Sequence, residues 1–171
     1  MTANICTAAT AQLMAGYNRW MNDSMYATAW TLDDEVRKAD AGAFFSSIHG
    51  TLNHLVWADQ TWMNRFAGTP APRVTSIAES PNLFDDFARL RAERQAMDVL
   101  ILQWAASIDD AWFAEDLTWF SGAAGREVTR PRGALVIHFF NHQTHHRGQV
   151  HALLTRAGVE APPTDIFLLS G

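Results

Sequence analysis

Four long segments in which apolar residues recur every three or four positions constrain the fold of this 171-residue chain most strongly. They run from about Asn4 to Ala29, from Phe44 to Phe66, from Asn82 to Ser107, and from just after Gly133 to Ala157. This spacing places the apolar side chains on one face of an α-helix, and that face must be buried against another element. Without an internal repeat or a second core, the pattern predicts one domain over residues 1–171, an all-α four-helix bundle.

Most segments between the predicted helices are expected to be loops. Residues 31–43 are polar and acidic, and residues 69–81 contain several prolines, so both are predicted to be irregular connections. Residues 112–132 differ, because two short β-prone stretches flank a glycine-containing turn and predict a β-hairpin-like excursion before the last helix. In the tail, residues 160–171, the apolar run Ile166-Phe167-Leu168-Leu169 is expected to dock on the bundle.

Composition and charge exclude several classes of protein. Hydrophobic residues make up 48% of the chain and charged residues 18%, which is typical of a globular protein. The net charge is −5 and the 13 Lys and Arg residues are scattered, which argues against a nucleic-acid partner. No apolar run approaches the roughly 18 residues of a membrane span, and the N-terminus does not resemble a signal peptide.

The single cysteine, Cys6, cannot form an internal disulfide, so a cytoplasmic location is expected. A nucleophilic role for Cys6 is disfavoured, because no histidine stands beside it in the sequence. The chain also carries seven Trp and ten Phe residues, which is a heavy aromatic load. Many of these rings are expected to fill the core, and others to line a pocket or a subunit interface.

Five of the seven histidines lie in the last predicted helix, at positions 138, 142, 145, 146 and 151. At about 100° per residue, His142 and His146 are about 40° apart, on the same face as the apolar side chains of the helix. His138 and His145 lie on the flank of that face, and His151 lies opposite. The pattern therefore predicts an inward-facing pair, His142 and His146, one helical turn apart.

A buried pair of imidazoles needs partners for its ring nitrogens, since an unsatisfied buried group costs about 1–3 kcal/mol. Protonating both rings would place like charges on one turn. A divalent metal resolves both problems, because imidazole nitrogen is a good ligand for Zn, Ni, Cu or Fe. The i, i+4 spacing also lets two rings converge on one ion. Two hydrogen-bonded structural histidines would equally explain such a pair.

A third metal ligand would have to come from another helix, and His54 and His49 are the candidates in the second helix. His54 lies off the apolar stripe, among small residues that suit a helix contact, a cleft wall or a solvent-exposed face. The pattern leaves its position open. Asp59 lies on the apolar stripe, and a buried carboxylate needs partners. It would either orient a metal ligand or, as favoured here, form an ion pair with an arginine.

Several of these segments together resemble the DinB-like family of the DinB/YfiT superfamily. The strongest match is the sequence Asn141-His142-Gln143-Thr144-His145-His146-Arg147-Gly148-Gln149-Val150. Supporting matches, in chain order, are Tyr17-Asn18-Arg19-Trp20-Met21-Asn22, the stretch from Leu52 to Asp59 with Trp62, and Pro162-Pro163-Thr164-Asp165. Because their order and separation cover nearly the whole chain, the resemblance concerns the entire sequence.

The resemblance implies an up-down-down-up four-helix bundle that is often a homodimer. It also implies a metal ion, commonly nickel or zinc, held by one histidine of the second helix and two of the fourth. On this sequence these are His54, His142 and His146, and no ligand position is substituted. Relatives include transferases that use low-molecular-weight thiols and metal-dependent hydrolases or isomerases. The family resemblance does not imply DNA binding.

The function that follows is a metal-dependent enzyme, either a thiol-dependent S-transferase or a hydrolase, of unknown substrate. Three histidines leave a coordination position open for water or a thiolate. His145, His138 or Asp59 are candidates for moving a proton or orienting a ligand, and Trp57 and Trp119 for lining the substrate cleft. The alternatives are a non-catalytic metal-binding stress-response protein and a dimeric interaction module.

Overall fold

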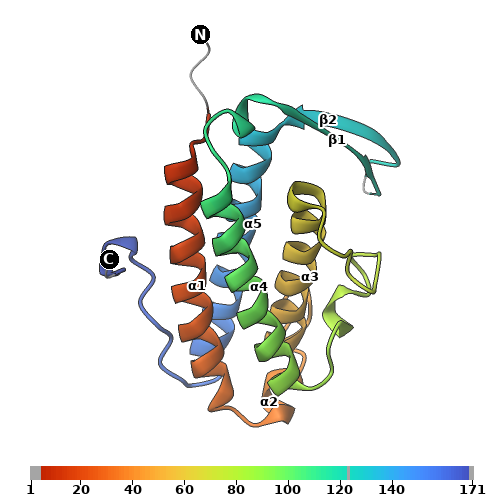
Figure 1. The fold of residues 1–171 in the computed structure, drawn as a ribbon. Helices are drawn as coiled ribbons and strands as arrows, with labels where there is room; N and C mark the ends of the chain where they lie inside the picture. The colour runs from red at the N-terminus through yellow and green to blue at the C-terminus, as the bar shows by residue number, and fades with distance from the viewer. Residues whose placement is uncertain (1–4, 123, 170–171) are drawn as a thin grey trace.

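The computed structural model describes residues 5–122 and 124–169, and the chain in it is mostly helical (Figure 1). The long helices are α1 (Ala8–Trp30), α3 (Ile48–Ala67), α4 (Phe87–Ser107) and α5 (Arg132–Arg156). A short helix, α2 (Asp34–Lys38), and an antiparallel hairpin, β1 (Asp116–Ser121) and β2 (Arg126–Pro131), complete the main elements, with single 3₁₀ turns at η1 (Ser80–Asn82), η2 (Trp112–Ala114) and η3 (Ile166–Leu168). None of the described helices is long and apolar enough to cross a membrane.

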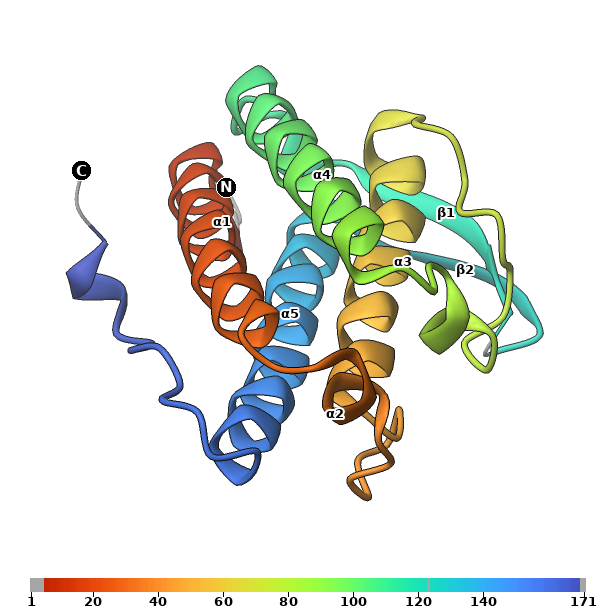
Figure 2. The same cartoon turned by 90° about the horizontal axis from the view of Figure 1, so that it is seen from below.

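The long helices lie side by side and bury their apolar faces against one another (Figure 2). Helix α1 contacts α4 and α5, and α3 contacts the same two helices. One apolar cluster joins the end of α1 and the start of α3, around Met25 and Leu52. A second joins the start of α1 and the end of α3, around Ala11 and Phe66. Burial of these two clusters accounts for the association of the helices.

A buried polar network connects the long helices. Asp59 of α3 accepts a hydrogen bond from Arg94 Nη1 of α4 at 2.6 Å, and Arg94 Nη2 lies 2.9 Å from Asp98 Oδ1. Asn22 of α1 donates to Asp98 at 2.9 Å, and Gln143 of α5 donates to Asp59. The ion pair that the sequence pattern favours for Asp59 is therefore present. The network that contains it connects α1, α3, α4 and α5.

The helices begin where capping side chains stand rather than where the apolar pattern begins. Ser47 accepts a hydrogen bond from an amide of the first turn, so α3 begins directly after it and not at Phe44. Asp86 caps α4 in the same way, five residues into the segment predicted to be helical from Asn82. Cap side chains satisfy amides that have no partner within the helix, which fixes the helix start.

The connection over residues 31–43 is not a simple loop, because it contains α2. Two short-range ion pairs, Arg37–Asp34 at 3.3 Å and Lys38–Asp34 at 2.8 Å, support this helix. Arg37 also stacks over Phe87 at 4.5 Å, which anchors α2 to the body. A helix of one and a half turns is too short to produce a detectable apolar period. The hairpin predicted within residues 112–132 is confirmed.

The two chain ends differ from the sequence predictions in detail. The predicted start of the first helix at Asn4 lies outside the described residues, and α1 follows its cap, Thr7. The tail runs beside α1 (Figure 1), where Tyr17 Oη donates to Thr164 O at 2.6 Å. Of the apolar run that was predicted to dock, Leu169 is partly buried beside Gly16 of α1, whereas Phe167 is 80% exposed. The predicted docking of the tail is therefore confirmed only in part.

Candidate metal centre

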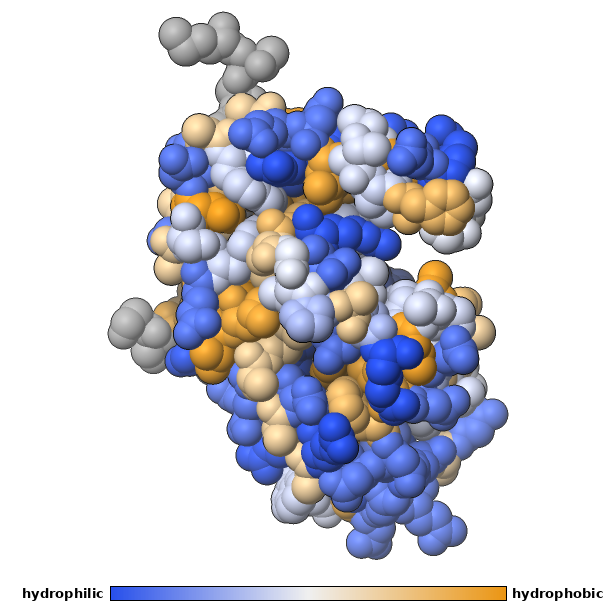
Figure 3. Space-filling view, turned by 45° about the vertical axis from the view of Figure 1, so that its right-hand side comes forward, coloured by the Kyte–Doolittle hydropathy of each residue, from blue (hydrophilic) through white to orange (hydrophobic). Residues whose placement is uncertain are grey.

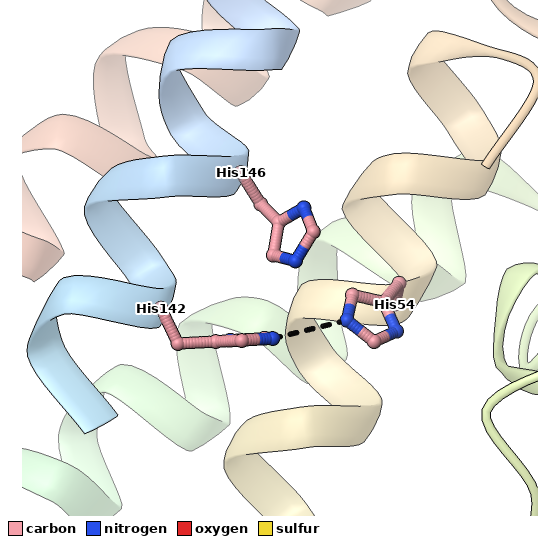
Figure 4. A group of neighbouring side chains, drawn as sticks. All are labelled: His54, His142 and His146. Carbon is pink, nitrogen blue, oxygen red and sulfur yellow. Dashed lines mark hydrogen bonds between the residues drawn. The ribbon is translucent and has the colours of Figure 1, made fainter. Parts of the chain in front are cut away.

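Three histidines from two helices converge on one point (Figure 4). His142 and His146 project from successive turns of α5, and His54 faces them from α3. One ring nitrogen of each lies within 4.8 Å of the corresponding nitrogen of the other two. The nitrogens His54 Nε2 and His142 Nε2 are 3.2 Å apart. The two histidines predicted to face inward from α5 therefore meet a third histidine.

The spacing of these nitrogens fits a metal centre. Imidazole nitrogens lie about 2.0–2.1 Å from zinc, so two of them in a tetrahedral site are about 3.3 Å apart. The 3.2 Å between His54 Nε2 and His142 Nε2 matches this separation. Neutral imidazoles are also ligands that divalent transition metals prefer. The residues present thus fit a divalent metal ion.

The packing of α3 explains why His54 is buried although it lies off the apolar stripe. Helix α3 is enclosed on nearly all sides, since η1 and α5 cover the face that carries His54. The His54 ring stacks on Phe45 at 3.8 Å and on Trp57 at 5.6 Å, and only 3% of the residue is exposed. His54, whose orientation helical periodicity leaves open, therefore faces the interior of the protein.

Ser80 determines which nitrogen of His54 is available as a ligand. Its hydroxyl donates to Ile77 O at 2.6 Å, so its oxygen must accept from His54 Nδ1, which lies 2.9 Å away. His54 therefore carries its proton on Nδ1, and its Nε2 lone pair faces His142. An outer hydrogen bond of this kind orients a metal-ligating imidazole and raises its basicity.

Gln149 orients His146 in the same way from within α5. His146 Nδ1 lies 2.8 Å from Gln149 Oε1, and because an amide oxygen only accepts, the ring donates from Nδ1. Gln149 Nε2 in turn lies 3.2 Å from the Nε2 of His145, to which it donates. Two of the three histidines are thus held with the Nε2 lone pair free for a ligand bond.

Replacing Ser80 with alanine is expected to weaken metal binding by about 10–100-fold, because His54 loses the acceptor that fixes its tautomer. Metal affinity would be measured by competition with a chromophoric chelator. Ser24→Ala is the matched control, since Ser24 donates to a backbone carbonyl of α1. Equal affinities of the Ser80→Ala variant and the wild type would contradict the orienting role.

Burial keeps the three rings neutral. It lowers the pKa of His54 to about 3, with the neighbouring imidazoles of His146 and His142 adding to the effect. The pKa of His142 is likewise lowered to about 3 by burial and then by nearby imidazoles, and burial also lowers that of His146. Neutral rings carry the lone pairs that a metal needs, so the cluster is ready to bind near pH 7.

The metal-free protein is expected to lose stability as the pH falls below about 6.5. The unfolded chain binds protons at its histidines near that pH, whereas folded His54 and His142 stay neutral until about pH 3. The unfolded state then holds more protons, so each ring lowers the free energy of unfolding by at most about 1.4 kcal/mol per pH unit. Urea denaturation at pH 7 and pH 5 measures this, and a smaller loss is expected for His54→Leu. An equal loss of stability in His54→Leu would show that the buried His54 ring does not contribute to the pH dependence.

Three residues considered from the sequence lie outside the cluster. His49 Nε2 donates to Phe84 O at 2.8 Å, so His49 is not the third histidine. Asp59 is occupied by Arg94 and Gln143, and it is not among the clustered ligand atoms of the described residues. It reaches the centre only through Gln143, the residue that follows His142. Cys6 is buried in the apolar cluster around Ala11.

Three other candidates lie beside the cluster, and a fourth lies further away. The exposed His138 ring lies 6.0 Å from that of His142, and the exposed His145 ring lies 4.8 Å from that of His146. Trp57 stacks on His54 and donates from its indole to Val74 O at 2.8 Å. Trp119 of β1 lies further away and contacts α3 rather than a cluster histidine.

Sequence reasoning missed three residues that shape the centre: Phe45, Ser80 and Gln149. Gln149 follows His146 by three positions, so helical spacing alone was enough to suggest its contact. Phe45 and Ser80 lie in the connections before and after α3, outside the helix. Helical periodicity therefore does not predict that they contact His54. Their contacts exist only because the connections fold back over α3.

Fold and cluster together define a helical protein with a candidate three-histidine metal centre. The chain matches the DinB family over residues 5–170, and it belongs to this family. It is 28% identical over 162 residues to Protein DinB of Bacillus subtilis strain 168, an alignment that covers 89% of this chain and 88% of the relative. The resemblance drawn from the motifs is confirmed.

Proposed function

We propose that this protein binds a divalent metal through His54, His142 and His146 and acts as a metal-dependent enzyme on a small molecule. The observation that carries the proposal is the convergence of three imidazole nitrogens within 4.8 Å, with two rings oriented by Ser80 and Gln149. Nickel and zinc are the proposed metals, as membership of the family suggests. A low-molecular-weight thiol or water is the proposed nucleophile.

An open coordination position supports a catalytic rather than a structural site. Among the described residues, no fourth His, Cys, Asp or Glu joins the three histidines. Structural zinc sites usually have four protein ligands, whereas catalytic sites keep one position for an exchangeable ligand. A divalent metal held here would lower the pKa of a thiol or water bound to it.

Residues around the centre are placed to transfer protons and to contact a substrate. His138 and His145 are exposed and lie against His142 and His146, so either ring is placed to move a proton between the site and solvent. Trp119 is half-buried and offers flat apolar surface for a substrate, whereas Trp57 is buried and supports His54 from behind. Asp59 is proposed only to orient α5 through Gln143.

Metal analysis of protein purified without a histidine tag tests the binding proposal. About one equivalent of nickel or zinc per chain is expected after loading and desalting. Failure of the wild-type protein to retain any divalent metal would end the proposal.

A thiol-transfer assay with the metal-loaded protein tests the enzyme proposal. With an aryl chloride as electrophile, a carbon–sulfur bond forms, the carbon–chlorine bond breaks, and chloride and the thiol proton are released. Faster loss of free thiol with metal-loaded than with metal-free protein supports a transferase, and faster hydrolysis of an activated ester supports a hydrolase. Tight metal binding with neither activity favours a non-catalytic metal-binding protein.

We infer that the long helices follow the up-down-down-up order of a four-helix bundle, in a single domain. The ends of α1 and α5 share one apolar cluster with the starts of α3 and α4, which supports this order. A homodimer is also proposed, because apolar side chains such as Leu13 and Phe167 are 52% and 80% exposed. Sedimentation velocity would measure the dimer, and a monomer at micromolar concentration would contradict it.

A further inference from the structure

Arg65 of α3 lies half-buried between two indole rings. Its guanidinium carbon is 4.5 Å from the centre of the Trp62 ring and 5.5 Å from that of Trp119. The two indoles meet at 5.8 Å, edge to face, and join α3 to strand β1 of the hairpin. A guanidinium stacks readily on an indole face while its N–H edge stays available for a ligand.

The charge of Arg65 has no carboxylate partner. Among the described residues, no acidic oxygen lies within 4.0 Å of it, and its guanidinium makes no hydrogen bond there. Arg132 provides the contrast, because it stacks on Trp112 at 4.9 Å and also pairs with Glu115 at 2.8 Å. Burial lowers the pKa of Arg65, as expected for a cation without a counter-ion. Arg65 therefore has unused capacity for an anion.

Ring contacts lead from Arg65 toward the three-histidine centre. The Trp62 ring lies 5.3 Å from that of His138, which lies 6.0 Å from that of His142. In the space-filling view the hairpin stands out from the body above a hollow that opens to solvent (Figure 3). Trp119 crosses from the hairpin to α3, so the Arg65 cluster lies where hairpin and body meet.

We propose that Arg65, Trp62 and Trp119 form a subsite for the carboxylate of a small substrate with a flat, apolar body. This inference rests on the proposed metal centre as the place of reaction, which the substrate would reach past His138. A guanidinium donates two parallel hydrogen bonds to a carboxylate, and the indoles supply flat apolar contact.

Arg65 supplies one guanidinium to this subsite, and the two rings that it contacts are indoles. One guanidinium matches one carboxylate, because its N–H groups pair with the two carboxylate oxygens. A conjugated or aromatic carboxylate is the matching ligand class.

Calorimetric titration with benzoate and with its neutral isostere benzamide tests the subsite. The wild-type protein is expected to bind benzoate at least about tenfold more tightly than benzamide, and Arg65→Gln to lose that preference, because a charged hydrogen bond is removed. Arg65→Lys keeps the positive charge but cannot donate two parallel hydrogen bonds, so its preference for benzoate should be intermediate. Arg132→Gln is the matched control and should behave as wild type. Metal affinity is expected to be unchanged in all three variants.

The metal-free His142→Ala variant separates this inference from the proposed function. Benzoate binding that survives in His142→Ala and disappears in Arg65→Gln places the carboxylate at Arg65, whether or not the protein retains metal. Binding that disappears in His142→Ala and survives in Arg65→Gln places the carboxylate on the metal and overturns the subsite. Absence of benzoate binding by the wild type up to roughly 10 mM, the range of weak fragments, also overturns it.

Discussion

Replacing His142 with alanine is expected to lower the affinity of the protein for nickel or zinc by at least about 100-fold. Changes to groups that only orient a ligand already cost about 10–100-fold in metal affinity, and His142 would supply a coordinating nitrogen itself. Its Nε2 lies 3.2 Å from that of His54, and it is one of the three converging ring nitrogens. Two remaining imidazoles on different helices bind an ion less well than three.

The loss of metal affinity in His142→Ala should also reduce the stability that the metal adds to the folded protein. Metal at 100 times its dissociation constant adds about 2.7 kcal/mol to the free energy of unfolding, through binding to the folded state alone. After a 100-fold loss of affinity, the same concentration adds only about 0.4 kcal/mol. Chelator competition and urea denaturation with and without metal measure the two effects independently.

His151→Gln is the matched control for this experiment. His151 belongs to the same helix, but its Nε2 donates to Pro162 O of the tail at 3.2 Å, away from the cluster. The variant is expected to bind metal as the wild type does. Equal metal affinity in wild type, His142→Ala and His151→Gln would place the metal elsewhere in the protein and refute the centre described above.

Replacing Asp59 with alanine is expected to destabilise the folded protein by about 3–5 kcal/mol, the cost of breaking a buried ion pair on one side. Arg94 and Asp59 are 2% and 1% exposed at their side chains, so water cannot replace the lost carboxylate. Gln143 also loses its acceptor. Asp98 alone remains beside the Arg94 guanidinium.

Chemical denaturation measures this effect, and an exposed ion pair provides the control. Asp85 lies fully exposed at 3.1 Å from Lys38, and Asp85→Ala is expected to change the free energy of unfolding by less than about 1 kcal/mol. A loss in Asp59→Ala no larger than that in Asp85→Ala would show that the buried network contributes little. Because Gln143 follows His142, a weaker metal affinity is also expected for folded Asp59→Ala.

The inward pair on α5 was predictable because it depends on local geometry alone. His142 and His146 are four residues apart on a long helix, so helical rise and turn bring their rings to 4.5 Å whatever the rest of the chain does. The same reasoning identified the apolar faces, since burial of one face is what gives a helix its period. The pairing of Asp59 with an arginine followed from the cost of burying a carboxylate, although periodicity could not single out Arg94.

His54 shows where such reasoning ends. Its position in helical register suited solvent as well as a cleft wall, and the family motif alone pointed to it as a ligand. The structure places η1 over that face and seats Ser80 against the ring, at 2.9 Å from Nδ1. Contacts between segments far apart in sequence leave no periodic trace, because each depends on how a connection folds back.

The helical segments, the hairpin and the two histidines of α5 were predictable from the sequence, since all of these follow from the geometry of neighbouring residues. Packing of the whole chain brought His54 to them, oriented its ring through Ser80, and left Arg65 between two indoles without a carboxylate among the described residues. Helix packing decides which faces are buried together, and that packing depends on the whole chain at once.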